Sequence, residues 1–181
     1  MKFHKTLLEG VVVVEPSVFQ DERGFFFESY NQALFAQNGI QADFVQDNHS
    51  VSAKGVLRGL HYQAKPMQQA KLVRVVCGEA FDVVVDLRQN SKTFGCAIHH
   101  ILSAENKKMV YIPAGFAHGF LSLKDGTEFL YKVSKPHSKT HERGIPWNDP
   151  ALKIDWPKLD IPYLVSEKDK NHPSLKSAEL F

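Results

Sequence analysis

Residues 71–87 read KLVRVVCGEAFDVVVDL, and this stretch decides the fold class of the chain. Two valine-rich runs, 71–76 and 80–87, lie on either side of a short segment that contains Gly78. Residues branched at Cβ favour strands, and a glycine between two such runs marks a turn. The stretch therefore predicts two β-strands joined as a hairpin.

Further strands are predicted on both sides of this hairpin. Short β-branched or aromatic runs recur at intervals of about ten residues, separated by polar or glycine-containing turns. Only segment 31–39 has a helical pattern, with Asn31 as its N-cap and Gly39 as its stop. Many strands and one short helix predict an all-β protein, either a double-sheet jelly roll or a closed barrel. The other predicted strands are 11–14, 25–30, 44–51, 96–102, 109–112, 116–123 and 128–133.

The tail from residue 141 to residue 181 has a different character. Prolines at positions 146, 150, 157, 162 and 173 interrupt any regular element there. We expect the tail to be extended chain that wraps over the sheets. The chain has 181 residues, of which 43% are hydrophobic and 23% charged, so residues 1–181 are expected to form a single domain.

Composition argues against several classes of protein. The formal net charge is +2 with both signs mixed along the chain, so we expect no nucleic-acid partner. The longest apolar run, 11–14, is too short to cross a membrane, and no signal-peptide core follows the N-terminus, so a cytoplasmic protein is expected. Cys77 and Cys96 lie in separate apolar runs and are predicted to be buried free thiols.

The segment 55–63, GVLRGLHYQ, places cations and an imidazole on a predicted strand. Arg58 and His61 are three residues apart, which puts them on opposite faces of a regular strand. A bulge at Gly59 would bring both to one face. An imidazole that accepts a proton near neutral pH, beside the ammonium of Lys71, suits carbanion or enolate chemistry. A structural histidine is the alternative for His61.

The predicted strand 44–51 has a polar centre between apolar ends. Its alternation directs the amides Gln46 and Asn48 to one face and Asp47 and His49 to the other. Grouped amides suit a base or a ligand rich in hydroxyls. An edge strand that faces water explains them nearly as well.

The segment 113–120, PAGFAHGF, contains Pro-x-Gly-x-x-His and resembles the second motif of the cupin jelly rolls. Metal-binding cupins have His-x-His and a carboxylate in their first motif, and here that piece is His61-Tyr62-Gln63. His61 and His118 beside Lys71 are too few ligands for a divalent metal. The chain therefore resembles a cupin without a metal, and Gln63 disfavours a metal-dependent cupin oxygenase or isomerase.

Six motifs together resemble the dTDP-4-dehydrorhamnose 3,5-epimerase family, from about residue 7 to about residue 170. The resemblance implies a cupin-like jelly roll with short peripheral helices. It also implies a substrate, dTDP-4-dehydro-6-deoxy-D-glucose, and a reaction, inversion at C3 and C5 on the way to dTDP-L-rhamnose. The motifs are DERGFFFE (21–28), QDNHS (46–50), VLRGLHYQ (56–63), QAKLVR (69–74), IPAGFAHGF (112–120) and WNDP (147–150).

The resemblance also implies residue roles, with no metal and no cofactor. His61 matches the family's base, and Asp169 matches the carboxylate that orients it. Tyr131 matches the acid that returns a proton from the other face, and Lys71 suits stabilisation of the enolate oxygen. The residues assigned to substrate binding by the same match are Arg23, Glu28, Gln46, Asp47, Asn48, Arg58, His118, Glu142 and Lys168.

Family members are homodimers that exchange a strand, so the resemblance implies a homodimer in which N-terminal residues complete the partner's pocket. The chain departs from the family at Pro136 and His137, where an aromatic pair is usual, which affects contacts near the nucleotide. A single-site epimerase or ketoisomerase would share the fold and the base. A nucleotide-sugar binding module is the alternative outside the enzymes.

Overall fold

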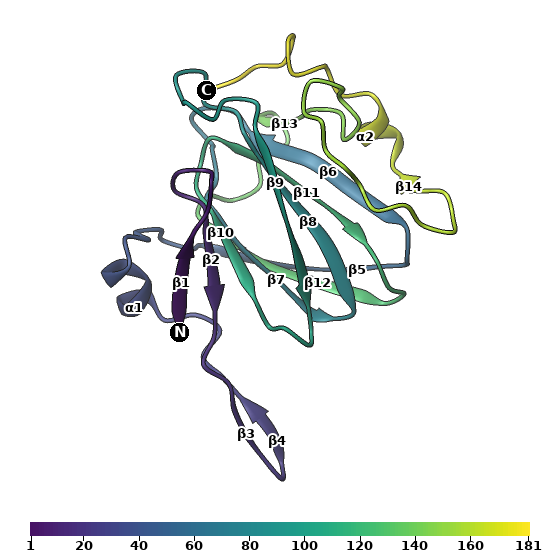
Figure 1. The fold of residues 1–181 in the computed structure, drawn as a ribbon. Helices are drawn as coiled ribbons and strands as arrows, with labels where there is room; N and C mark the ends of the chain where they lie inside the picture. The colour runs from purple at the N-terminus through teal and green to yellow at the C-terminus, as the bar shows by residue number, and fades with distance from the viewer.

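A computed structural model describes residues 1–181 and contains two six-stranded sheets (Figure 1). The sheets pack against each other as a jelly roll, so the predicted fold class is confirmed. Sheet I is ordered β1 (Lys2–Lys5), β2 (Val12–Glu15), β10 (Met109–Ile112), β7 (Lys71–Cys77), β12 (Thr127–Val133) and β5 (Gln46–Ser52). Sheet II is ordered β13 (Glu142–Gly144), β6 (Val56–Gln63), β11 (Phe116–Ser122), β8 (Glu79–Asp86) and β9 (Ala97–Ser103), with β14 (Leu164–Val165) beside β6.

The central core lies between the two sheets. Val73 and Val75 of sheet I and Val84 of sheet II are at most 3% exposed and belong to one cluster. Phe120 of sheet II stacks on Phe129 of sheet I, with ring centroids 4.2 Å apart and an interplanar angle of 1°. Each fully buried side chain of this kind contributes about 1.5–3 kcal/mol to stability, so this layer fixes the two sheets face to face.

The predicted hairpin of residues 71–87 is wrong. Both segments are strands, but β7 pairs with β10 and β12 in sheet I, whereas β8 pairs with β9 and β11 in sheet II. The chain crosses between the sheets at Gly78, whose φ is +75° and where an added Cβ would lie 2.5 Å from Thr127 Oγ1. A glycine turn allows either connection, and only the distant partners of each strand distinguish them.

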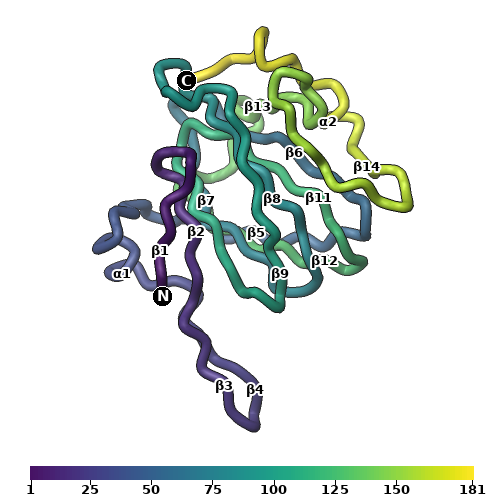
Figure 2. The backbone as a smooth tube through the Cα atoms, viewed as in Figure 1, coloured from purple at the N-terminus to yellow at the C-terminus, as the bar shows by residue number.

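The region 17–40 forms a projecting hairpin and a helix. The predicted strand 25–30 is shorter than expected, since β4 (Gly24–Phe26) pairs only with β3 (Phe19–Asp21), and this hairpin extends away from the sheets (Figures 1 and 2). Helix α1 (Gln32–Gln37) is confirmed, with the Asn31 side chain accepting from the Leu34 N–H. It packs Phe35 onto the outer face of sheet I.

The tail covers the outer face of sheet II, as predicted (Figure 2). Trp156 and Leu152 of the tail join Leu57 and Phe81 of the sheet in a second buried cluster. The tail is not wholly irregular, because it also supplies β13, β14 and helix α2 (Glu167–Lys170).

The prediction that both cysteines are buried is wrong. Cys77 and Cys96 are free and exposed. Cys77 is the last residue of β7 at the crossing between sheets, and Cys96 precedes β9, so neither reaches the core. No helix of the structure is long and apolar enough to cross a membrane.

Candidate active site

The site begins with a distortion of β6. Gly59 has φ of +129°, and the register between β6 and β11 shifts beside it. Leu57 and Leu60, three residues apart, both join the core beneath the tail. Arg58 and His61, also three apart, both line a pocket on the opposite side. The predicted role of Gly59 in bringing Arg58 and His61 to one face is confirmed.

No other residue fits at position 59 without a shift of the backbone. A Cβ there would lie 2.5 Å from the Gly119 Cα of the neighbouring strand, and the positive φ disfavours any L side chain. The bulge therefore depends on glycine at this position.

The pocket lies between the sheets and has a volume of about 500 Å³. Side chains from three parts of the fold converge on it. An adjoining cavity of about 370 Å³ shares His61, Lys71 and Tyr131 and extends the pocket toward β5. The residues predicted for the site that line the first cavity are Arg58, His61 and His118 from sheet II, Lys71 and Tyr131 from sheet I, and Lys168 and Asp169 from α2.

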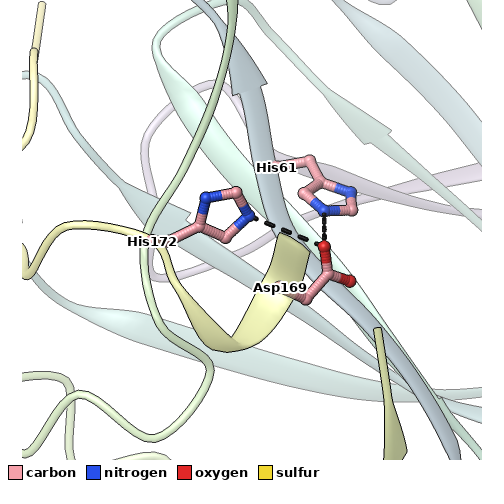
Figure 3. A group of neighbouring side chains, drawn as sticks. All are labelled: His61, Asp169 and His172. Carbon is pink, nitrogen blue, oxygen red and sulfur yellow. Dashed lines mark hydrogen bonds and ion pairs between the residues drawn. The ribbon is translucent and has the colours of Figure 1, made fainter. Parts of the chain in front are cut away.

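His61 and Asp169 form a hydrogen-bonded pair, with 2.8 Å between Nε2 and Oδ1 (Figure 3). Because a carboxylate only accepts, the pair places the ring proton on Nε2 and the lone pair on Nδ1. Nδ1 makes no hydrogen bond within the chain and is not buried. It is the nitrogen that is free to take a proton.

Hydrogen bonds from several parts of the fold fix the position of Asp169. It is 3% exposed and follows Ser166, the N-cap of α2, whose hydroxyl accepts from the Asp169 N–H. The Gly59 N–H donates to Oδ2, so the bulge that orients His61 also fixes its partner. Burial opposes its charge, but the nearby His172 imidazole and the hydrogen bonds from His61 and the Gly59 N–H together keep the pKa of Asp169 well below its usual range.

Burial shifts the pKa values of the other titratable groups in the pocket. Burial lowers the pKa of His61 despite the opposing effect of Asp169, so the imidazole is neutral at pH 7. Burial lowers the pKa of Lys71 to about 8, against the attraction of Asp82 and Glu142. Burial raises the pKa of Tyr131, so its hydroxyl stays protonated. The pocket thus contains a neutral base, a largely protonated ammonium and a protonated phenol.

The predicted binding residues in the adjoining cavity come from β5 and β13. Gln46 and Asn48 both line the cavity, and the Gln46 Nε2 donates to the Asn48 Oδ1 at 2.8 Å. Asp47 points to the other face, where the Lys132 ammonium donates to it at 2.9 Å. The predicted alternation of this strand is confirmed, and the side chain of Asp47 does not line either cavity.

Glu142, also predicted, forms an ion pair of 2.5 Å with Lys168. It lies 3.5 Å from His137, which lines the same cavity.

Comparisons with known proteins identify the family of the chain. The family model described as dTDP-4-dehydrorhamnose 3,5-epimerase matches residues 5–177. The dTDP-4-dehydrorhamnose 3,5-epimerase of Pseudomonas aeruginosa is 55% identical over 182 residues, which cover 100% of this chain and 99% of that protein. The chain belongs to the dTDP-4-dehydrorhamnose 3,5-epimerase family.

Solved structures of this family share the fold. The dTDP-6-deoxy-D-glucose-3,5-epimerase of Legionella pneumophila, in complex with dTDP-4-keto-L-rhamnose, superposes with a TM-score of 0.94 and 44% identity, covering 97% of this chain and 93% of that one. A 3'-monoepimerase of Streptomyces bikiniensis, in complex with dTDP-quinovose, gives a TM-score of 0.90 and 38% identity, covering 96% and 88%.

Besides Asp47, two predicted binding residues of this epimerase lie away from the pocket. Arg23 is at the turn of the β3–β4 hairpin, where it pairs with Asp21 and its side chain is 85% exposed. Glu28 accepts a hydrogen bond from the Asn31 side chain. Arg23 and Glu28 do not pair with each other. Within one chain, neither residue reaches His61.

Two residues of the site were not foreseen. Asp82 is fully buried on β8 and accepts from His118 Nε2 at 2.6 Å, so it orients a predicted binding residue. The sequence signal for Asp82 is a charged residue within the valine-rich run 80–87. His172 lies 3.6 Å from the Asp169 carboxylate, and only its spacing of three residues from Asp169 hinted at a contact.

Proposed function

We propose that His61, held by Asp169, is the base that removes protons from C3 and C5 of the sugar. The enzyme inverts both carbons of dTDP-4-dehydro-6-deoxy-D-glucose to give dTDP-4-dehydro-L-rhamnose, a step in dTDP-L-rhamnose biosynthesis. Both carbons flank the C4 ketone, so loss of either proton gives a stabilised enolate. The observation that carries the proposal is the 2.8 Å pair between His61 and Asp169, which leaves Nδ1 accessible.

Tyr131 is the acid that returns the proton from the opposite face. It belongs to sheet I, whereas His61 belongs to sheet II, so the two side chains approach the pocket from opposite walls. Inversion requires donor and acceptor on the two faces of the reacting carbon. The raised pKa of Tyr131 keeps its proton available until the carbanion takes it.

Lys71 stabilises the negative charge that forms on the C4 oxygen. Its ammonium is enclosed between the sheets, where a charge interaction is stronger than in water. Asp82 and Glu142 act against the effect of burial on its pKa, which at about 8 leaves the group mostly protonated at pH 7. The enolate therefore needs no metal ion for its stabilisation in this scheme.

The remaining polar residues bind the nucleotide. Arg58, His118 and Lys168 supply cationic or donor groups for the diphosphate. The amides of Gln46 and Asn48, with Glu142, supply hydrogen bonds to polar parts of the ligand. Asp47, on the opposite face of β5, pairs with Lys132 instead. His137 replaces an aromatic residue and lines the same cavity, so it is available to stack on the base.

The enzyme acts as a homodimer that exchanges N-terminal segments. Phe19, Phe25 and Phe26 on the β3–β4 hairpin are 60–66% exposed, which is unfavourable for a hairpin that faces water. The hairpin projects from its own sheets, so a partner's surface is within its reach (Figure 1). In that arrangement Arg23 and Glu28 complete the partner's pocket, and each chain of 181 residues acts as a single domain.

A cytoplasmic location follows from the substrate. The diphosphate of a nucleotide sugar carries charges that keep it from crossing a bilayer unaided. An enzyme that consumes such a molecule works in the compartment where it is made.

Exchange with deuterium oxide tests the proposed mechanism. Incubation of the dTDP-keto sugar with the enzyme in deuterium oxide is expected to place deuterium at both C3 and C5, as detected by NMR. Exchange at C3 alone would indicate a monoepimerase like the Streptomyces relative. The absence of exchange at either carbon would contradict proton abstraction. Binding without turnover would identify a nucleotide-sugar binding module.

A further inference from the structure

Three potential metal ligands meet at the base of the pocket. His61 Nε2 lies 2.8 Å and His172 Nε2 lies 3.6 Å from the same Asp169 Oδ1, and the ligand atoms all lie within 4.8 Å of one another. The two rings are 5.7 Å apart and nearly perpendicular, and both nitrogens face the carboxylate (Figure 3). Two imidazoles and one carboxylate are a set of ligands that zinc binds.

His172 has an unsatisfied nitrogen in this cluster. Its side chain is only 10% exposed, and Nε2 is buried with no hydrogen-bond partner, because 3.6 Å to Asp169 is too long. A buried nitrogen without a partner is unfavourable and calls for an explanation. Gly144 provides the space for this ring, since a Cβ at that position would collide with the imidazole.

We propose that His61, Asp169 and His172 form an inhibitory binding site for a divalent transition-metal ion such as Zn²⁺. Zinc lies about 2.0–2.2 Å from nitrogen and oxygen ligands, so tetrahedral ligands are about 3.3 Å apart. The separations of 2.8 and 3.6 Å are on either side of that value. The widest separation between the ligand atoms is at most 4.8 Å, so a closing movement of up to about 1.5 Å would enclose the ion, with a fourth position left for water.

Metal binding at this site blocks the base because it changes which nitrogen of His61 carries the ring proton. The ion takes the lone pair of His61 Nε2, the N–H bond there is lost, and a proton is taken up at Nδ1. The imidazole remains neutral, but Nδ1 no longer has a lone pair for a substrate proton. Turnover then stops, although the rest of the pocket still binds the nucleotide.

Both positive and negative groups surround the cluster, and they have opposite effects on the binding of a cation. Lys71 and Lys168 act on His61 with positive charge. Lys168 is paired with Glu142 at 2.5 Å, and Asp169 supplies a full negative charge at the site itself. His61 lines the pocket of about 500 Å³, which gives an ion a route from solvent.

Calorimetric titration of ZnCl₂ into the full-length, chelator-treated protein tests the site without any assumption about the reaction. We expect one ion per chain whose affinity falls by about tenfold or more in His172→Ala. His4→Ala is the matched control, because His4 also lies near a carboxylate, at 3.5 Å from Glu15, but on an exposed strand. Equal zinc affinity in wild type and His172→Ala would overturn the proposal.

A second variant and a second measurement distinguish loss of a metal ligand from misfolding of His172→Ala. His172→Gln keeps a polar side chain of similar length but lacks the imidazole, so weaker zinc binding is expected there too. Co²⁺ in place of Zn²⁺ should give the strong visible absorption of a four-coordinate ion in wild type and lose it in His172→Gln. Retention of that absorption would overturn the assignment of His172 as a ligand.

Inhibition is measured against each variant's own metal-free activity. Zn²⁺ is expected to lower kcat with little change in KM in wild type, because Nδ1 is blocked while the nucleotide contacts remain. The zinc concentration for half inhibition should rise by about tenfold or more in His172→Ala. If zinc binds at the expected stoichiometry but activity is unaffected, the inhibitory role fails, whereas the proposed epimerase mechanism is untouched.

Discussion

The pocket and the β3–β4 hairpin both carry residues that the family resemblance assigns to the site, but their surroundings differ sharply. In the pocket, His61, Lys71 and Tyr131 are enclosed between two sheets, and burial shifts the pKa of each. On the hairpin, Arg23 is 85% exposed and is paired only with its neighbour Asp21. One chain therefore assembles the proposed chemistry, whereas the hairpin is available to a partner. Changes in the pocket should act on kcat, and changes in the hairpin on KM.

The largest effect is expected from His61→Asn. Asparagine retains a polar side chain but has no group that accepts a proton near neutral pH, so kcat should fall by about 10⁴-fold. Steady-state kinetics and nucleotide binding by calorimetry measure the effect, with binding largely retained. The exposed His49→Asn, which removes an outward-facing imidazole paired with Glu128, is the control. A loss in kcat of less than about tenfold would exclude His61 as the base.

Tyr131→Phe should lower kcat by about 10²-fold to 10³-fold, because the carbanion loses its proton donor on the second face. His61 is intact in this variant, so deuterium exchange into unreacted substrate should continue faster than epimerisation. NMR of the recovered substrate and product gives both rates. Tyr111→Phe is the matched control, since burial also raises the pKa of Tyr111 but the residue lies on β10 outside the pocket. Equal losses in the two variants would argue against a proton-donor role.

Arg23→Ala should raise KM by about tenfold and leave kcat nearly unchanged, because a charged hydrogen bond to the ligand contributes about 1.5–3 kcal/mol. Glu22→Gln, the adjacent residue of the hairpin turn, is the control. Steady-state kinetics at a range of substrate concentrations separates the two parameters. A loss confined to kcat would contradict the proposed binding role.

Mixing two defective variants tests whether one chain completes the pocket of the other. If the hairpin completes the partner's pocket, an Arg23→Ala chain supplies an intact base and a His61→Asn chain supplies an intact hairpin. Random pairing after exchange should restore roughly a quarter of the pockets. Activity at low substrate concentration should then exceed the sum of the separate variants. If the activity of the mixture is only the sum of the two variants, Arg23 contributes to the pocket of its own chain or to no pocket.

The smallest effect is a shift in the pH profile. Activity requires neutral His61 and charged Lys71, so kcat/KM should fall as pH drops below the lowered pKa of His61. It should also fall as pH rises through about 8, where Lys71 loses its proton. Lys71→Arg should move the alkaline limb upward, because a guanidinium stays charged. Lys132→Arg, at a half-buried residue of the neighbouring strand β12 that faces Asp47 and not the pocket, should leave the limb in place.

The sequence predicts the parts of the site that depend only on neighbouring residues along a strand. The alternation of residues 44–51 correctly placed Gln46 and Asn48 opposite Asp47. Gly59 between Arg58 and His61 correctly indicated a bulge, since an odd spacing on one face of a strand requires one. Asp169 was named through the resemblance alone. Its position on α2, against the Gly59 N–H, was not expected from a proline-rich tail.

Other features depended on contacts between distant segments. The valine-rich runs around Gly78 predict a hairpin because each run is locally a strand and a glycine lies between them, but the two strands pair in different sheets. The buried hydrogen bond between His118 and Asp82 joins residues that are 36 positions apart in the sequence. His172 faces His61 only because the tail returns across β6.

The sequence by itself determined where strands lie, which side chains alternate along them and which residues have the chemistry for proton transfer. Those properties follow from backbone preferences and periodicity over a few residues. The tertiary structure decided which sheet each strand joins, which groups become buried and where the hairpin points. Strand pairing and desolvation depend on segments far apart in the chain, so the pKa shifts and the meeting of His61, Asp169 and His172 exist only in the folded protein.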